Sequence, residues 1–342
     1  MTDLLTPQST DAAIAAAYRG KTILITGGAG CIGSNLCRAL LDAGAAQVVL
    51  LDDLSAGPHW NLPSSDRITF IQGSVTDAKV LDRALAQQPE VVFHLAAFFA
   101  NQNSVEHPEE DLHVNGLGTL RVLQQAHRSG VGRVVYASSG CAVYDAEAPL
   151  PLREEFVTLR LATPYQITKL LGELYCNFFY LHHRLPVVQA RLFNVYGPGE
   201  VPGRYRNVIP NFFYWAHRRQ PLPITGTGEE TRDFTYVDDI VRGLLRCGVL
   251  PQAVGHAINL ACGQETRVLD LAEQINALTG NSAGLRRVER RCWDNQFRRR
   301  ACLKKAQTLL GYRPRTDLAC GLRRTLSWFQ NHLCEIEAAA RF

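Results

Sequence analysis

The sequence has no apolar run long enough to cross a membrane. Its longest near-apolar stretch, Val91–Ala100, contains His94 and is far shorter than the ~20 helical residues that a bilayer requires. The opening residues, MTDLLTPQST, lack the basic start and the apolar core of a signal peptide. The ten cysteines include no CxxC pair and no Cys/His cluster with zinc spacing. We therefore expect a soluble, cytoplasmic protein with reduced thiols and no bound metal.

Acidic residues are scarce between positions 286 and 305. Nine Lys and Arg side chains stand there against Glu289 and Asp294, a local net charge of +7 in a chain whose total is +4. Such a block can be a nucleic-acid-binding face, a solvated surface or an anion site for a phosphorylated substrate. The motifs described below favour the anion site, so we expect no nucleic-acid partner.

The stretch from Lys21 to Asp53 has the pattern of a dinucleotide-binding unit. An apolar run at 22–26 predicts a buried strand, glycines follow in GxxGxxG spacing, helical periodicity begins at Ile32, and a second apolar run ends on Asp52 and Asp53. Glycines allow close approach of a pyrophosphate to a helix N-terminus, and a carboxylate about 20 residues later can bond a ribose diol. Since that carboxylate would repel a 2′-phosphate, the pattern favours NAD over NADP.

Strand and helix patterns alternate through residue 195. Further strands are predicted over 68–71, 91–95 and 133–137, with helices beginning near Pro108 and at Pro164. This alternation predicts an α/β fold with a doubly wound parallel sheet (Rossmann) and a site at the carboxyl ends of its strands. Shorter strand signals beyond 195 predict a smaller α/β substrate-binding domain. We assign 20–195 and about 234–262 to the NAD-binding domain, 196–233 and 263–335 to the substrate domain, and 1–19 to an N-terminal extension.

A catalytic pair is predicted at the start of the helix at Pro164. Thr163 and Pro164 form a helix-start signature, and Tyr165 and Lys169, four residues apart, share one face. The positive charge of Lys169, with an oxidised nicotinamide nearby, would favour the phenolate and lower the pKa of Tyr165 toward neutrality. Such a base can take a proton from a sugar hydroxyl while hydride leaves the same carbon.

Together these motifs resemble the extended short-chain dehydrogenase/reductase family, most closely nucleotide-sugar epimerases and dehydratases of the UDP-glucose 4-epimerase type. The resemblance covers roughly residues 20–330 and rests on GxxGxxG, HLAA at 94–97, Asn115, the serines at 138–139, YxxxK, and segments around 191–198, 207–210, 231–239 and 291–294. It implies that NAD is bound by Gly27, Gly30, Cys31, Ile32, Gly33, Asp52, Asp53, Ser74, Val75, Leu95, Ala96, Ala97, Asn115, Ser138, Tyr165, Lys169 and Phe193. It implies that a nucleotide-diphosphate sugar is bound by Asn194, Asn207, Val208, Thr225, Arg232, Arg291 and Asp294, with Arg232 and Arg291 on the diphosphate.

The chain departs from the family pattern at the catalytic hydroxyl. The position that usually carries a catalytic serine or threonine holds Gly140, and SSGC at 138–141 resembles a Ser-Ser-Gly-Gly variant found in some relatives. Ser139 is then the expected catalytic hydroxyl, with Ser138 as the second candidate. Ser74 stands where most relatives have an acid that bonds adenine, and its hydroxyl can accept the same hydrogen bond.

Two positions discriminate between reactions of the family. Dehydratases of this type carry an Asp-Glu pair, and decarboxylases a glutamate, where this chain has Cys141 and Ala142. The resemblance therefore favours NAD-dependent epimerisation at C4 through a 4-keto intermediate, with Tyr165, Lys169 and Ser139 as the catalytic residues. The alternatives are a decarboxylase, dehydratase or dehydrogenase of the same family, and a non-catalytic NAD-binding regulator.

The sequence leaves the sugar and the nucleotide open. Uridine is the family default, and the substrate is expected to be a UDP-hexose or UDP-uronic acid; Arg204 and Arg206 add positive charge that would suit an acidic sugar. By the same resemblance, the helices near 108–128 and 164–182 would pair with their copies in a homodimer.

Overall fold

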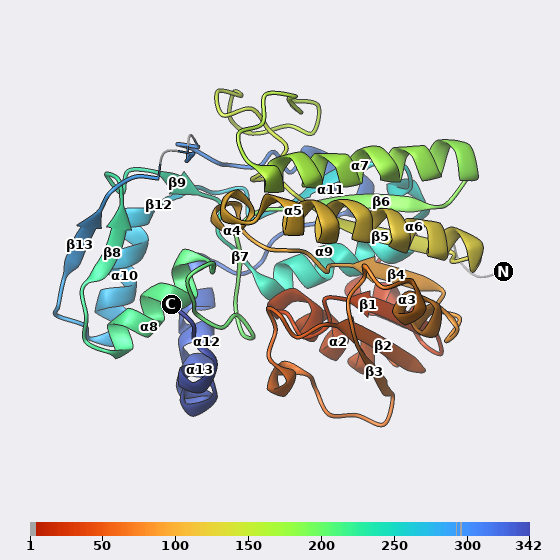
Figure 1. The fold of residues 1–342 in the computed structure, drawn as a ribbon, viewed down its shortest axis with the longest axis horizontal. Helices are drawn as coiled ribbons and strands as arrows, with labels where there is room; N and C mark the ends of the chain where they lie inside the picture. The colour runs from red at the N-terminus through yellow and green to blue at the C-terminus, as the bar shows by residue number, and fades with distance from the viewer. Residues whose placement is uncertain (1–4, 292, 295) are drawn as a thin grey trace.

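A seven-stranded parallel sheet forms the centre of the computed structural model, which describes residues 5–291, 293, 294 and 296–342 (Figure 1). The strand order is β11-β6-β5-β4-β1-β2-β3, so the direction of winding reverses between β1 and β4. This confirms the predicted doubly wound α/β fold, in which ligands bind at that reversal, beyond the carboxyl ends of the strands. The strands are β1 (Thr22–Thr26), β2 (Gln47–Asp52), β3 (Ile68–Gln72), β4 (Val91–His94), β5 (Arg133–Ser139), β6 (Val187–Leu192) and β11 (Ala257–Leu260).

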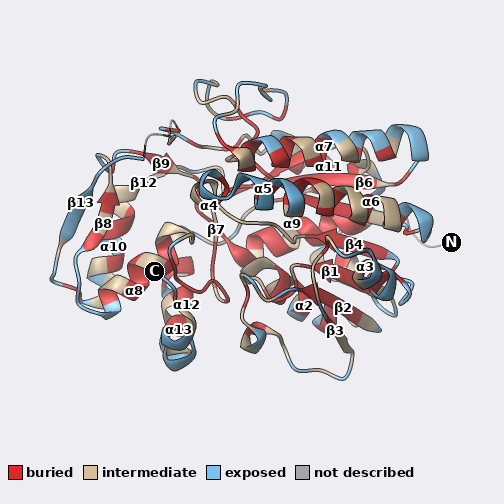
Figure 2. Cartoon of the chain, viewed as in Figure 1, coloured by how far each residue is buried: buried red, intermediate tan, exposed pale blue. Residues whose placement is uncertain are grey.

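Helices cover both faces of this sheet because its strands are apolar on both sides. Ile23 and Ile25 of β1 pack in a core with α2 (Cys31–Asp42) and α9 (Val237–Val249), while Leu24 points to the opposite core. That second core is closed by α3 (Ala78–Leu85), α6 (Thr119–Arg128) and α7 (Pro164–His183). Alternate residues of one strand thus enter different cores. Figure 2 shows the buried sheet and the exposed outer sides of α6 and α7.

The helix predicted to begin near Pro108 is interrupted. It starts as α5 (Pro108–Asp111), continues as a π-helical segment, η2 (Leu112–Gly118), and resumes as α6. A π-helical segment places one extra residue in a helical turn and is frequent at functional sites. Sequence periodicity does not reveal it, because the apolar spacing on either side is that of an ordinary helix.

The remaining elements lie mainly beside the sheet, at the left of Figure 1. They are β8 (Leu222–Thr225) paired with β13 (Leu285–Val288), β9 (Thr231–Arg232) paired with β12 (Thr266–Arg267), β7 (Val195–Tyr196) paired with β10 (Thr235–Tyr236), and the helices α4 (Asn101–Glu106), α8 (Val208–His217), α10 (Val268–Thr279), α11 (Lys304–Leu310), α12 (Leu318–Asn331) and α13 (Leu333–Ala339), with single turns η1 (His59–Asn61) and η3 (Pro251–Ala253). The division of the chain into a cofactor domain and a substrate domain stays a prediction.

The N-terminal extension forms a short helix, α1 (Asp11–Ala16), capped by Thr10. It is fixed to α9, where Arg246 donates to the carbonyl of Ser9 and pairs with Asp11 at 2.8 Å. Residues 1–4, which belong to the predicted extension, and Cys292, which belongs to the predicted 291–294 segment, lie outside the described residues.

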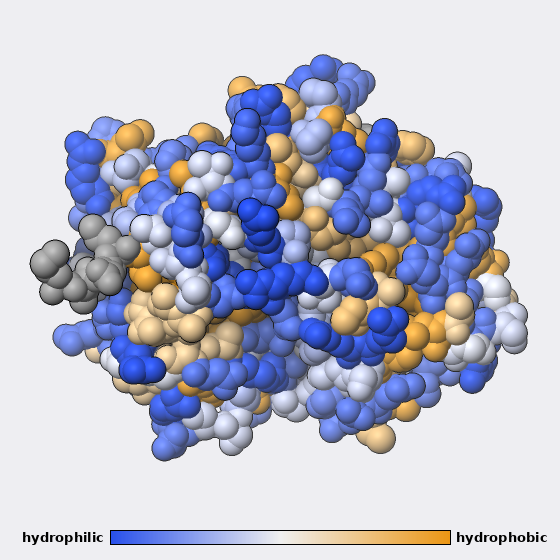
Figure 3. All heavy atoms as spheres, turned by 180° about the vertical axis from the view of Figure 1, so that it is seen from behind, coloured by the Kyte–Doolittle hydropathy of each residue, from blue (hydrophilic) through white to orange (hydrophobic). Residues whose placement is uncertain are grey.

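Within the described ranges, none of the helices combines the length and apolar character needed to cross a bilayer. Seen from behind, the molecule is largely hydrophilic, with apolar areas interspersed (Figure 3).

Candidate active site

A cavity of about 930 Å³ runs along the carboxyl ends of the central strands. Its size is in the range of cofactor and ligand pockets. All the predicted site residues except one line it, from Gly27 at the glycine turn to Asp294 at the far end. The exception is Asn115. Its amide bonds the backbone of Phe98 at 2.8 and 3.1 Å and the carboxylate of Asp111 at 2.7 Å, so it supports the cavity wall from behind rather than facing the cavity.

The glycine turn between β1 and α2 is shaped to receive a dinucleotide. Gly27 has φ of 75°, and a Cβ on Gly33 would lie 2.1 Å from the carbonyl oxygen of Gly27, so both positions require glycine. The N-terminus of α2 is capped by the backbone of Gly30, without a side-chain acceptor for its free N–H groups. These N–H groups are therefore available for a pyrophosphate, and the residues present fit NAD.

Asp52 and Asp53 close β2 with different surroundings. Asp52 is buried and accepts from the backbone N–H of Ala29 at 2.9 Å and of Leu54 at 2.8 Å. Burial raises the pKa of Asp52, and these two bonds oppose the rise. Asp52 thus fixes the glycine turn, a role that the sequence pattern did not predict, while Asp53 is exposed and bonds Ser55.

The predicted catalytic pair begins α7 as expected. Thr163 caps the helix in a capping box with Gln166, which fixes the first turn that carries Tyr165. Both Tyr165 and Lys169 are buried, and Lys169 Nζ lies 5.7 Å from the ring centre of Tyr165 and donates to the carbonyl of Ala137 at 2.9 Å.

Burial shifts the pKa values of both members of this pair. Burial lowers the pKa of Lys169 to about 8, with Asp111 opposing the shift. Burial, with Asp111 and Cys141, raises the pKa of Tyr165 above its ordinary value, and a hydrogen bond with Ser139 is the influence that lowers it. In the protein alone, desolvation of the phenolate is the main cause of this rise. The fall toward neutrality that we expect beside an oxidised nicotinamide stays a prediction.

The two serines of β5 have different partners. Ser138 donates to Glu173 Oε1 at 2.5 Å, whereas Ser139 lines the cavity beside Tyr165 and lowers the pKa of its hydroxyl. Gly140, at the position usually held by the catalytic hydroxyl, has no room for a side chain, since a Cβ there would lie 1.9 Å from the ring of Phe193. The structure therefore offers Ser139 as the hydroxyl next to Tyr165.

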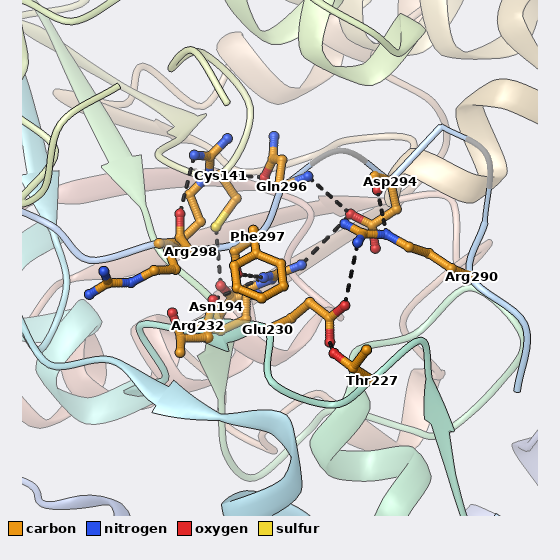
Figure 4. A network of polar contacts seen from close by, with 12 residues as sticks. Cys141, Asn194, Thr227, Glu230, Arg232, Arg290, Asp294, Gln296, Phe297 and Arg298 are labelled. Atoms are coloured by element: carbon orange, nitrogen blue, oxygen red, sulfur yellow. Dashed lines mark hydrogen bonds and ion pairs between the residues drawn. The ribbon is translucent and has the colours of Figure 1, made fainter. Parts of the chain in front are cut away.

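Cys141 occupies the position of the carboxylate found in dehydratases and decarboxylases. It lines the cavity, its Sγ lies 3.1 Å from Asn194 Oδ1, and burial raises the pKa of its thiol (Figure 4). A neutral thiol bonded to an amide lacks the charge and the basicity of a carboxylate.

The far end of the cavity carries arginines held by acids. Arg232 lies 3.8 Å from Asp294, and Arg290 lies 3.6 Å from the buried Glu230 and donates to the backbone carbonyl of Asp294 at 2.9 Å (Figure 4). Arg291 also lines the cavity, over the ring of Trp293. Guanidinium groups suit phosphates because they can donate two parallel hydrogen bonds.

Sequence reasoning missed two site residues. One is Glu173, which follows Lys169 by four residues on α7 and bonds Ser138; its spacing was a readable signal. The other is Glu200, which lines the cavity and belongs to no motif; Arg206, which the sequence associated with an acidic sugar, lines the cavity as well. In the part of the chain that is described, no three His, Cys, Asp or Glu side chains are grouped to hold a metal ion.

Comparison with known proteins gives a consistent family. The model of the NAD dependent epimerase/dehydratase family matches residues 23–261. A UDP-glucose 4-epimerase of Mycolicibacterium smegmatis is 35% identical over 311 residues, covering 90% of this chain and 98% of that protein. A UDP-N-acetyl-alpha-D-glucosaminuronate decarboxylase of Bacillus cytotoxicus is 32% identical over 321 residues, covering 91% and 98%.

A solved structure is similar over nearly the whole length. It is an epimerase from the methanogen Methanothermobacter thermautotrophicus, with a TM-score of 0.96 and 52% identity, covering 98% of this chain and 100% of that one. Since the family model spans most of the chain and these relatives cover nearly all of it, this protein belongs to the NAD dependent epimerase/dehydratase family and uses NAD as its cofactor.

Proposed function

We propose that this protein interconverts the C4 epimers of a UDP-linked hexose or hexuronic acid. The observation that carries the proposal is the composition of the catalytic corner. Tyr165, Ser139 and Lys169 line the same part of the cavity, Ser139 lowers the pKa of Tyr165, and the adjoining position holds Cys141 instead of a carboxylate. This set can move a proton at one hydroxyl but offers no acid–base pair there for eliminating water.

The residues of the corner have separate roles in this proposal. Tyr165 accepts the proton of the C4 hydroxyl at its phenolic oxygen, and Ser139 bonds both that oxygen and the sugar. Lys169 holds positive charge next to the ring of Tyr165 and is oriented by the carbonyl of Ala137. NAD bound in this cavity would supply the redox chemistry, as acceptor and then donor of the hydride at C4. Tyr165 then gives the proton back to the epimerised hydroxyl.

The arginines at the far end of the cavity provide the binding site for the charged part of the substrate. In the proposal, Arg232 and Arg291 bind the diphosphate, and Asp294 binds the ribose of the nucleotide. The UDP assignment is supported by the names of both curated relatives. Inversion at C4 requires the sugar to present either face to Tyr165 while its diphosphate stays bound. Tyr165 and Asp294 line the same cavity of about 930 Å³.

The test is incubation of the purified protein with a panel of UDP, dTDP, GDP and CDP sugars, read by NMR at C4. Epimerisation of one sugar that is abolished in Tyr165→Phe supports the proposal. The matched control is Tyr175→Phe, which removes a hydroxyl from the same helix outside the cavity. Release of carbon dioxide would identify a decarboxylase, steady NADH accumulation a dehydrogenase, and full activity of Tyr165→Phe would falsify the catalytic assignment.

A homodimer formed through α7 and η2 is part of the proposal. Exposed apolar side chains follow one face of these elements: Leu112, Ile167, Leu174, Phe178 and Leu181. The spacing of the four on α7 is that of a helical stripe, which commonly packs on a second surface. Light scattering should show a dimer that Leu174→Lys dissociates. Leu159→Lys, which changes a side chain 88% exposed in a loop, should leave the dimer intact.

A further inference from the structure

Arg206 comes from the segment after β7 but reaches the cofactor half of the cavity. Its guanidinium donates to the backbone carbonyl of Ala56, in the loop that follows β2. The next residue, Gly57, lies so close to the glycine turn that a Cβ on it would be 2.3 Å from the carbonyl carbon of Ala29. The bond to Ala56 therefore holds Arg206 beside the turn that receives the pyrophosphate of NAD.

The charges around Arg206 agree with this position. Burial lowers the pKa of Arg206, and the charges that oppose the shift are Glu200, Cys31 at the start of α2, and Asp52 at the end of β2. Glu200 is buried, lines the cavity, and has a carboxylate oxygen, Oε2, without a hydrogen-bond partner among the described residues. A pyrophosphate brought to this place would lie near the carboxyl groups of Glu200 and Asp52, and the guanidinium of Arg206 is the positive charge there that would attract it.

The segments that Arg206 joins also touch at a second point. Asn61, buried at the end of the loop after β2, donates to the carbonyl of Ala29 and to the carbonyl of Gly199, both at 2.9 Å. Residues 55–57 of the loop and 199–201 of the other segment line the same cavity. A dinucleotide bound against the glycine turn would thus lie beneath two contacts that connect segments more than a hundred residues apart in the chain.

We propose that Arg206 is a direct ligand of the NAD pyrophosphate and that, held by its bond to Ala56, it slows the dissociation of NAD between turnovers. A guanidinium has five N–H donors, so donors remain for phosphate oxygens besides the one given to Ala56. The sequence associated Arg206 with an acidic sugar, whereas this proposal assigns it to the cofactor. Arg204 has a separate partner, Glu106, at 2.9 Å.

The experiment counts nucleotide instead of turnover, so it is independent of the reaction proposed above. Wild type, Arg206→Ala and Arg38→Ala are purified in parallel, and the NAD that each retains is quantified after denaturation. Dissociation is then measured by loading each protein with labelled NAD and following its release after addition of excess unlabelled NAD. Arg38 is the matched control. It donates to the carbonyl of Asn61 at 2.9 Å and holds the same loop, but it does not line the cavity.

We expect NAD to dissociate roughly 10- to 100-fold faster from Arg206→Ala, the range for loss of a charge-assisted hydrogen bond, and near the wild-type rate from Arg38→Ala. In nucleotide-free protein, Arg206→Ala should weaken the binding of ADP-ribose, which carries the pyrophosphate, and leave the binding of adenosine unchanged. Unchanged NAD release in Arg206→Ala overturns the proposal. Equal loss in both variants also overturns it, because loop anchoring would then be the whole effect. Arg206→Gln, which keeps a polar side chain but removes the positive charge, carries the same test if the alanine variant does not fold.

Discussion

Replacing Glu173 by glutamine should destabilise the protein strongly, although the change alters one atom. Glu173 and Arg191 form an ion pair beneath the catalytic corner, and both side chains are 4% exposed. The carboxylate accepts from Arg191 Nε at 2.8 Å, from Arg191 Nη2 at 2.7 Å and from Ser138 at 2.5 Å. Burial by itself would lower the pKa of Arg191, but Glu173 and Tyr144 together outweigh burial and raise it.

The magnitude follows from what glutamine cannot do. Its amide keeps one acceptor oxygen and turns an N–H2 group toward donors, so at least one charge-assisted bond is lost, at about 1.5–3 kcal/mol. The guanidinium of Arg191 is then buried without a counter-charge, and breaking such a pair typically costs about 3–5 kcal/mol in total. For a chain of this length, 4 kcal/mol corresponds to a fall in Tm of about 5 °C.

Urea unfolding and calorimetry of Glu173→Gln would measure the loss, with Arg191→Met and the double variant Glu173→Leu/Arg191→Met as controls. The double variant should recover most of the stability, since it removes both charges together. A loss below about 1 kcal/mol in Glu173→Gln, or a double variant no more stable than either single one, would refute the reasoning.

Three further predictions follow from single contacts. Burial raises the pKa of Glu200 from 4.5 to about 7, so native Glu200 keeps a proton that the unfolded chain loses between these values, and stability should fall as pH rises through that window. Glu200→Gln should remove this dependence and raise the free energy of unfolding by at most about 3 kcal/mol at pH 8, as measured in urea titrations at several pH values. A pH profile of stability that runs parallel to that of the wild type would contradict this. Tyr18→Phe deletes the bond to the carbonyl of Leu245 at 2.6 Å and should cost about 1 kcal/mol in the same assay; an unchanged midpoint would show that α1 is not held there. Gly57→Ala should push the loop after β2 away from Ala29, costing about 1–3 kcal/mol and weakening NAD binding by calorimetry; wild-type affinity would show that the loop can shift freely.

Local pattern was sufficient for the elements of the fold. Strands β1 to β5 lie where apolar runs predicted them, within two residues at each end, and the capping box at Thr163 begins α7 at Pro164. These features depend on neighbours in the sequence, such as side-chain acceptors for free N–H groups and the alternation of buried faces. The interruption of the helix at η2 escaped the pattern, because a π-helical turn changes the register without changing the apolar spacing.

Contacts between distant segments required the tertiary structure. The sequence left Ser138 and Ser139 as alternatives, and their partners, Glu173 and Tyr165, become visible only when α7 lies over β5. The ring of Phe193 explains Gly140, which in the sequence was an unexplained departure from the family pattern.

The sequence by itself determined the fold class, the cofactor unit and the YxxxK pair, because each is encoded by residues within one or two neighbouring elements. Only the tertiary structure decided which hydroxyl meets Tyr165, that desolvation raises the pKa of that tyrosine, and that Arg206 reaches Ala56. Burial, and contacts between residues more than a hundred positions apart, arise from the packing of the whole chain, and no local pattern records them.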